Sequence, residues 1–247
     1  MMTNDRMKID MPSKVFDTCL SLEKYYHHVE NGGDYYVLMA GGVLYIFLQW
    51  THGKEDWKNN FDFPAKPYKD MPKAWRAHRG FVRVWKSIEP YIEKDVKNPE
   101  VKSIVVVGYS HGAALAVLAH EYIWFSRPDI REKCISLAFE APRVFCGVRV
   151  PAELKERWSN LYVFRVANDI VTHVPPALFG YKHVGNFVHI MKPKTGWVAH
   201  RKLGCVNAHY PDNVLTALER CQEVIKAQDE GAGWKKYKWF DKEEEDA

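Results

Sequence analysis

A short glycine-flanked segment carries the strongest chemical signal in the sequence. Residues 108–112 read Gly-Tyr-Ser-His-Gly and place Ser110 in a G-x-S-x-G pattern. The pattern is informative only between a strand and a helix, and an apolar run does precede it while a long apolar stretch follows. On such a sharp turn the serine hydroxyl would stand above the sheet, near the positive end of the helix dipole. We therefore expect Ser110 to act as a nucleophile.

A serine nucleophile needs a base, and the base needs an acid that orients it. After a turn of this kind the acid and then the histidine follow in chain order. Asp169 comes shortly after the apolar run 161–166, at the end of a predicted strand, where active-site groups of parallel sheets gather. Asp169 is therefore the expected acid.

Five of the eleven histidines follow that aspartate: His173, His183, His189, His200 and His209. We favour His209 as the base because it lies in a predicted loop directly before the last predicted helix. His200 is the second candidate. His173 is only four residues from Asp169, and the other two lie in or beside a predicted strand, so structural roles fit these three better.

The elements that would position these side chains alternate between strands and helices. Two apolar runs flank Gly41-Gly42 and predict a hairpin. The expected strands are Tyr35–Ala40, Val43–Trp50, Ile104–Val107, Ile135–Phe139, Leu161–Val166 and Phe187–Met191, and the expected helices are Phe81–Ile92, Gly112–Phe125 and Asn213–Gln228. Residues 51–80 read as a long loop, which in a compact domain is usually functional. The fold class is α/β, with a mainly parallel sheet flanked by helices on both faces.

Composition narrows the class of protein. The chain has 247 residues, 47% of them apolar and 27% charged, which fits one domain over 1–247 with a short flexible N-terminus and an acidic C-terminal tail. The net charge of +4 comes from interspersed charges rather than a basic stripe, which argues against a nucleic-acid partner. Oligomeric state has no signature in the sequence.

Cysteine use and hydropathy bear on the compartment. The five cysteines form no C-x-x-C pair, so we expect free thiols in a reducing compartment and no metal site. No apolar leader stands at the start of the chain, and no apolar run reaches the ~20 residues that span a bilayer. The expectation is a cytoplasmic protein without a transmembrane segment, with export by another route left open and at most transient contact with a lipid interface.

Further motifs occur in order along the chain. They are Thr51 to Trp57, His78 to Phe81, the segment around Ser110, Ala141 to Val144, Phe164 to Pro176, Tyr181 to Gly185, and His209-Tyr210. With these motifs the chain resembles the class 3 lipases, the fungal-lipase-like α/β-hydrolases, from about Tyr36 to Leu218. The resemblance implies an α/β-hydrolase fold. It also implies an enzyme that cleaves lipid or smaller acyl esters through an acyl-enzyme, with no cofactor and no metal.

The resemblance also implies an oxyanion hole. Its two parts would be the backbone amide of His111 and the residue after the early strand, Thr51. Two donors of this kind stabilise charge that develops on the substrate oxygen. The chain departs from the family pattern by having Gln49-Trp50 where Arg-Gly is usual, and His111 where leucine is frequent. A backbone donor does not depend on side-chain identity, so the amide half is less affected.

The loop at about 52–70 corresponds to the family's lid and is heavily charged. Placing such charges against oil costs several kcal/mol unless they stay hydrated. We therefore expect short or medium acyl esters to be cleaved in solution, with no jump in rate when an emulsion forms. Two alternatives remain open: a phospholipase or thioesterase on the same fold, or a catalytically silent binding module.

Overall fold

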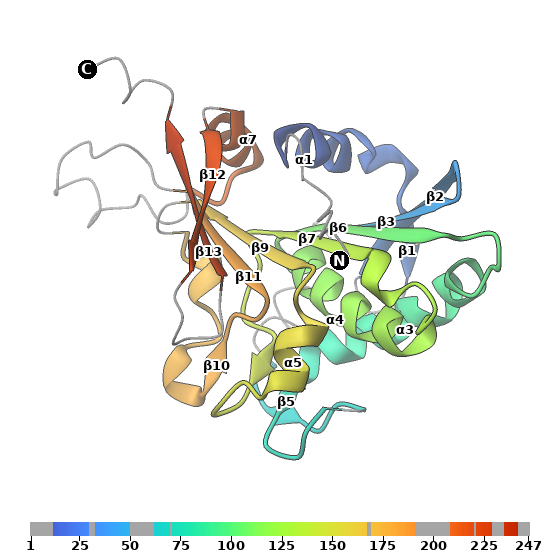
Figure 1. The fold of residues 1–247 in the computed structure, drawn as a ribbon, viewed down its shortest axis with the longest axis horizontal. Helices are drawn as coiled ribbons and strands as arrows, with labels where there is room; N and C mark the ends of the chain where they lie inside the picture. Colours follow the sequence, from blue (N-terminus) through green and yellow to red (C-terminus); the bar gives the residue numbers. More distant parts are fainter. Residues whose placement is uncertain are drawn as a thin grey trace, which may run out of the picture.

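A mainly parallel sheet crosses the whole molecule (Figure 1). The computed structural model describes residues 12–29, 33–49, 62–69, 71–166, 169–190, 208–219, 221–228 and 235–241. Within these residues the strands of the large sheet are β1 (His27–Val29), β2 (Gly33–Ala40), β3 (Val43–Gln49), β6 (Ser103–Tyr109), β7 (Cys134–Phe139), β9 (Leu161–Val166), β11 (Asn186–Ile190), β12 (Cys221–Gln228) and β13 (Lys235–Asp241). Their order across the sheet is β1-β2-β3-β6-β7-β9-β11-β13-β12.

The centre of the sheet is parallel and its two edges are antiparallel. Strands β3, β6, β7, β9, β11 and β13 run in one direction. At one edge β2 pairs antiparallel with β3 through a two-residue turn, and both glycines of that turn, Gly41 (φ 58°) and Gly42 (φ 80°), have positive φ. Two residues of positive φ suit a type I′ turn, and the hairpin predicted at these glycines is confirmed.

Helices cover both faces of the sheet (Figure 1). The helices are α1 (Pro12–Ser21), α3 (Arg79–Val96), α4 (His111–Ser126), α5 (Ala152–Arg157) and α7 (Pro211–Glu219), and short 3-10 turns are at 23–25, 131–133, 171–173 and 177–179. Helices α3 and α4 pack on one face, and α1 and α7 pack on the other.

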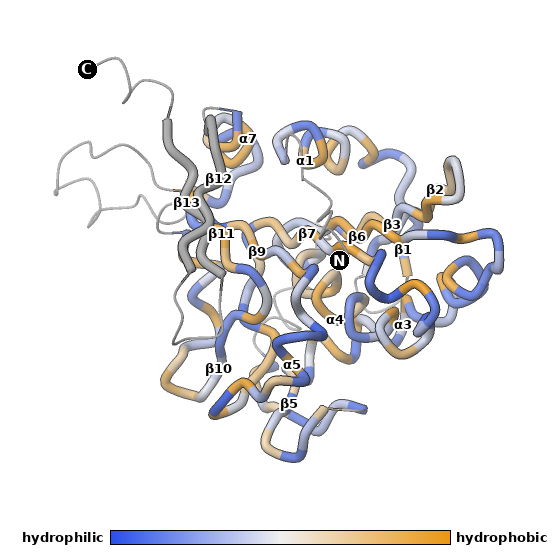
Figure 2. The backbone as a smooth tube through the Cα atoms, in the orientation of Figure 1, coloured by the Kyte–Doolittle hydropathy of each residue, from blue (hydrophilic) through white to orange (hydrophobic). Residues whose placement is uncertain are grey.

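The most apolar segments lie at the centre of the molecule. Strands β6 and β7 and helix α4 are predominantly apolar (Figure 2). Helix α4 is buried along residues 111–123, which explains why its sequence is apolar on nearly every face. The turn that carries Ser110 is therefore fixed between two of the best-packed elements of the fold.

A second, smaller sheet lies beside the α3–α4 face. It consists of β4 (Ala65–Lys66), β5 (Arg76–His78), β8 (Phe145–Cys146) and β10 (Tyr181–Lys182), in the order β10-β8-β5-β4. His78 ends β5 and caps α3, because its Nδ1 accepts a hydrogen bond from the backbone N–H of Phe81 at 3.3 Å. The histidine of the His78–Phe81 motif thus has a structural role.

Most elements predicted from the sequence are confirmed, including the hairpin, the four parallel strands and the helices that begin near residues 81 and 112. The predicted helix Asn213–Gln228 is wrong in its second half. Helix α7 ends at Glu219, and Cys221–Gln228 form β12, paired antiparallel with β13. The backbone of that segment gains cross-strand hydrogen bonds from a strand far along the chain, which an amphipathic pattern does not reveal. The sequence did not predict α1, α5, β1, β13 or the four strands of the smaller sheet. Two of those strands, β4 and β5, lie within residues 51–80, which were predicted to be a loop throughout.

Candidate active site

The backbone at Ser110 has the strained geometry expected of a nucleophile turn. Ser110 connects β6 to α4 with φ 55° and ψ −120°, a conformation that L-residues rarely adopt. A Cβ on Gly108 would come 2.2 Å from the carbonyl oxygen of Gly112, and one on Gly112 would come 2.1 Å from that of Leu48. Both glycines are therefore required sterically, because strand, turn and helix approach one another too closely for a side chain.

The three residues selected from the sequence as nucleophile, base and acid form a continuous hydrogen-bonded chain. Ser110 Oγ lies 2.8 Å from His209 Nε2, and His209 Nδ1 lies 2.6 Å from Asp169 Oδ2. Asp169 is fully buried, whereas the His209 side chain retains some exposure. The structure thus brings together Ser110 from the centre of the sheet, Asp169 from the loop after β9, and His209 from the residue pair before α7.

Several groups hold the loop that carries Asp169. Its Oδ1 accepts a hydrogen bond from the backbone N–H of Val171 at 2.9 Å, and its carbonyl oxygen accepts one from Thr172 Oγ1 at 2.8 Å. Arg143 donates to the carbonyl oxygens of His173 and Pro175, the latter at 2.9 Å. Arg143, the arginine of the Ala141–Val144 motif, lies in the segment between β7 and β8 and therefore anchors this loop from a neighbouring connection.

Tyr109 supports His209, a role that the sequence did not predict. The two rings stack with centroids 5.3 Å apart, and the Tyr109 hydroxyl donates a hydrogen bond to the His209 carbonyl oxygen. Burial, followed by the nearby carboxyl groups of Glu140 and Asp169, raises the pKa of Tyr109, so the phenol stays protonated and remains a donor. The only sequence signal was the position of Tyr109 beside the nucleophile.

The other described candidates for the base contact groups other than Ser110. His173 Nδ1 is 2.8 Å from the Asp169 carbonyl oxygen, and His183 Nε2 is 2.7 Å from that of Thr172. Burial lowers the pKa of His183 to about 3, which keeps its ring neutral. His189 lies on β11 with Nε2 3.4 Å from Arg165 Nη2. The second candidate base, His200, is outside the described residues.

Of the two residues expected to form the oxyanion hole, His111 lies among the described residues. His111 is the first residue of α4, where backbone N–H groups have no acceptor within the helix. Its ring is buried edge-on against Phe81, with centroids 5.3 Å apart, and burial lowers its pKa to about 4. Thr51 lies outside the described residues, as does most of the lid-like loop.

Three of the described residues have ligand-type atoms close enough to share a metal ion. Oxygens of Glu140 and Asp169 and a ring nitrogen of His209 lie within 4.8 Å of one another. However, His209 Nδ1 and Asp169 Oδ2 are 2.6 Å apart, a hydrogen-bond distance. Two ligands each about 2.0–2.2 Å from one zinc ion would be separated by more than that. The distance between His209 Nδ1 and Asp169 Oδ2 therefore fits a hydrogen bond between these two atoms.

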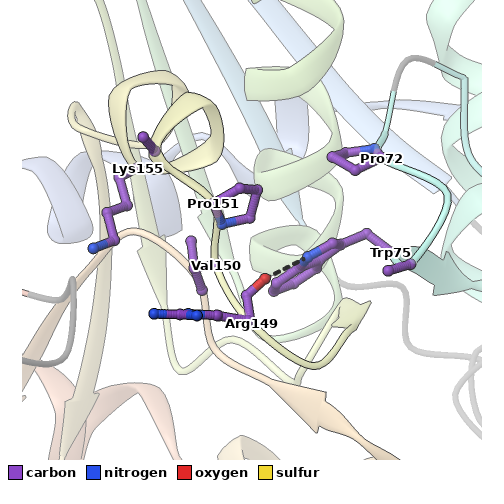
Figure 3. Close-up of a pocket in the computed structure, with 8 residues that line it drawn as sticks. Pro72, Trp75, Arg149, Val150, Pro151 and Lys155 are labelled. Atoms are coloured by element: carbon purple, nitrogen blue, oxygen red, sulfur yellow. Dashed lines mark hydrogen bonds between the residues drawn. The ribbon is translucent and has the colours of Figure 1, made fainter.

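A pocket of about 550 Å³ lies apart from these residues (Figure 3). It is lined by Pro72, Ala74, Trp75, Arg149, Val150, Pro151, Ala152 and Lys155. Trp75 Nε1 donates to the Arg149 carbonyl oxygen at 3.0 Å and ties its two walls together. No residue of the hydrogen-bonded chain lines this pocket, so it has no evident part in chemistry at Ser110.

Comparison with known proteins places the sequence in one family. A sequence model of the lipases of class 3 matches residues 45–179, more than half of the chain. The chain belongs to the class 3 lipase family. The family resemblance predicted from the motifs is therefore confirmed, and the matched region includes Ser110 and Asp169.

Similar proteins in this class 3 lipase family are fungal. Over 149 residues the chain is 26% identical to a lipase of Rhizopus niveus, covering 58% of this chain and 37% of the relative. Over 132 residues it is 33% identical to the secreted mono- and diacylglycerol lipase A of Penicillium cyclopium, covering 50% of this chain and 40% of the relative. The matches thus span about two fifths of the length of these relatives.

Solved structures establish the fold of this class 3 lipase family member. The Rhizomucor miehei triacylglyceride lipase aligns with a TM-score of 0.59 at 17% identity, covering 79% of this chain and 91% of that chain. A mutant of the Penicillium cyclopium lipase aligns with a TM-score of 0.53 at 24% identity, covering 67% and 62%. The predicted α/β-hydrolase fold is confirmed.

The relatives correct the predicted compartment. The sequence predicted a cytoplasmic protein, but the Penicillium cyclopium and Fusarium solani relatives are named secreted lipases, which points to an extracellular location. The prediction was wrong because it rested on the first residues of the given sequence and on its free cysteines, and neither of these decides the compartment. Within the described part of the chain, no helix is both long and apolar enough to cross a bilayer.

Proposed function

We propose that this protein is a serine hydrolase that cleaves acyl esters through a covalent acyl-enzyme. The observation that carries the proposal is the hydrogen-bonded chain from Ser110 through His209 to Asp169, on a strained turn between β6 and α4. His209 takes the proton of Ser110 as its oxygen attacks the ester carbonyl, and then delivers a proton to the departing alcohol. Water, activated by the same histidine, then hydrolyses the acyl-enzyme.

Asp169 and the start of α4 stabilise the charges of this reaction. Buried Asp169 accepts from His209 Nδ1, which fixes the ring orientation and favours the imidazolium that forms. The amide of His111, at the positive end of the α4 dipole, is the proposed main-chain donor to the oxyanion. Thr51 is proposed as the second donor, by analogy with the family pattern.

The proposed substrates are mono- or diacylglycerols or other esters of short or medium acyl chains. Relatives named mono- and diacylglycerol lipases support a glycerol ester. Exposed apolar side chains directly follow two residues of the triad: Ile170 is 49% exposed and Tyr210 is 54% exposed. They offer apolar surface beside the proposed site, where an acyl chain would contact the protein.

The described end of the lid-like loop, residues 62–69, is tied to the body of the protein through its charged residues. Asp62 forms ion pairs with Arg79 and Arg83, and Lys69 pairs with Glu89 at 2.8 Å. Tyr68 is buried against Phe145 rather than exposed. This segment therefore does not present a broad apolar face to a lipid surface, which supports cleavage of dissolved substrates.

The nucleophile is tested by Ser110→Ala in the full chain. Turnover of p-nitrophenyl butyrate and labelling by a fluorophosphonate probe should both disappear, because the substitution removes only the attacking oxygen. Ser21→Ala, at the exposed end of α1, is the matched control and should keep both. A folded Ser110→Ala protein with wild-type turnover would exclude Ser110 as the nucleophile.

The substrate class is tested with p-nitrophenyl esters from acetate to palmitate, each measured below and above its solubility limit. We expect the highest kcat/KM for short or medium chains and a smooth rate curve through the solubility limit. A steep rise that begins only when long-chain triglyceride is emulsified, with little action on dissolved esters, would contradict the proposed substrate.

A further inference from the structure

A second buried carboxyl group lies behind the acid of the proposed triad. Glu140 directly follows β7, is 0% exposed and has φ 53°, a left-handed conformation that is unfavourable for a residue with a side chain. Its backbone N–H donates to the Phe164 carbonyl oxygen at 2.8 Å, and its Oε1 accepts from the backbone N–H of Val166 at 2.6 Å. The side chain thus extends the β7–β9 pairing past the end of the strands.

A carboxyl oxygen of Glu140 lies close to two residues of the proposed triad. Oε2 is buried and accepts no hydrogen bond from any donor among the described residues. A Glu140 oxygen, an Asp169 oxygen and a His209 ring nitrogen lie within 4.8 Å of one another. The other ionisable groups that act on Glu140 are Arg165 on β9 and the phenol of Tyr109 on β6.

Two carboxylates this close and this deeply buried cannot both be ionised without a large energetic cost. Among the described residues, Asp169 accepts hydrogen bonds from the Val171 amide and from His209 Nδ1, whereas Glu140 accepts one, from the Val166 amide. Donors stabilise the charged form, so the charge belongs on Asp169. Burial, and then the contact with the Asp169 carboxyl group and the repulsion by its charge, raise the pKa of Glu140 well above its usual range, against the weaker effects of the Val166 amide and Arg165.

We propose that Glu140 is a protonated carboxylic acid that donates a hydrogen bond from Oε2 to Asp169, and so acts as a positioning residue of the triad. The inference rests on the proposed function, because Asp169 matters only if His209 is the base. With the hydrogen bond in place Asp169 is held from three sides: by Val171, by His209 and by Glu140. The strained backbone at residue 140 is retained because the side chain fills this place.

Two substitutions separate positioning from simple packing. Glu140→Gln is neutral and keeps a donor for Asp169 and an acceptor for Val166, so kcat should stay within about threefold of wild type. Glu140→Gly relieves the positive φ and removes both contacts. We expect kcat for p-nitrophenyl butyrate to fall about 10-fold to 100-fold in the glycine variant, with KM little changed, because a misplaced base slows the chemical step.

The pH profile shows which form of Glu140 is present. If Glu140 is protonated, Glu140→Gln changes no charge near His209, and the acidic limb of kcat/KM stays where it is in the wild type. If Glu140 were ionised, the variant would lose a negative charge beside the imidazole, and the limb would move to lower pH. Such a shift, or wild-type kcat in a folded Glu140→Gly protein, would overturn the proposal.

Unfolding provides a readout that does not depend on activity. Glutamate in the unfolded chain ionises near pH 4.3, so a protonated Glu140 makes the wild type lose stability relative to Glu140→Gln as the pH rises from 5 to 8. We expect the Tm of Glu140→Gln minus the Tm of the wild type to increase as the pH rises over this range. A constant difference would refute the proton on Glu140. Absence of esterase activity in the wild type would instead refute the proposed function, whatever the unfolding result.

Discussion

Asp169 depends on a few individual hydrogen bonds, and each can be removed by one substitution. Asp169→Asn should lower kcat by about 10³-fold to 10⁴-fold, because an amide favours the wrong tautomer of His209 and cannot stabilise the imidazolium. KM should change little, since Asp169 is fully buried and does not contact substrate. Initial rates on p-nitrophenyl butyrate measure the effect, with a substitution of the exposed Asp17 of α1, Asp17→Asn, as the control. Near wild-type kcat in the variant would show that Asp169 is not the orienting acid.

Strand β3 and helix α4 meet at Gly112, and this contact fixes the height of Ser110 above the sheet. Gly112→Ala would place a methyl group 2.1 Å from the Leu48 carbonyl oxygen, so the helix and the strand must separate. We expect a loss of several kcal/mol of unfolding free energy and a loss of esterase activity, as for other overpacked cores.

Gly41→Ala is the matched control for this contact. Gly41 has φ 58°, but no atom lies within 4 Å of an added Cβ, so only backbone strain of about 1 kcal/mol is expected. Urea unfolding of both variants separates steric overlap from strain. Equal destabilisation by the two substitutions would mean that the approach of β3 and α4 is not as close as described.

Buried histidines make the stability of the whole molecule depend on pH. Burial lowers the pKa of His111 and His120 to about 4 and that of His183 to about 3. In the unfolded chain histidines titrate near pH 6.5, so below that pH the unfolded state binds more protons than the folded state. Stability should therefore fall as the pH drops from about 6.5 toward 4.

Relative to pH 7, the expected loss of unfolding free energy at pH 5 is roughly 1–2 kcal/mol for each of these three histidines. Glu140 acts in the opposite direction with its raised pKa, but it is one group against three. Urea unfolding at pH 7 and pH 5 measures the balance. Equal or greater stability at pH 5 would show that these histidines are not held neutral in the folded protein.

What the sequence alone determined was local. Gly108 and Gly112 around Ser110 specify the turn, because the close approach they permit depends on the adjacent strand and helix, and both are visible as apolar runs. The parallel strands and the helices on both faces follow from the same hydrophobic patterns. The order of Asp169 and His209 after the serine then favoured the pair that the structure brings within hydrogen-bond distance.

Other features were decided only by the tertiary structure, since they depend on residues far apart in the chain. His209 is 99 residues from Ser110, and no pattern near it distinguished it fully from His200. Glu140 comes close to Asp169 because β7 and β9 are neighbouring strands and the backbone at residue 140 has a positive φ. Residues 221–228 form a strand because β13 offers a pairing edge. Contact across the sheet, and not local propensity, settled each of these outcomes.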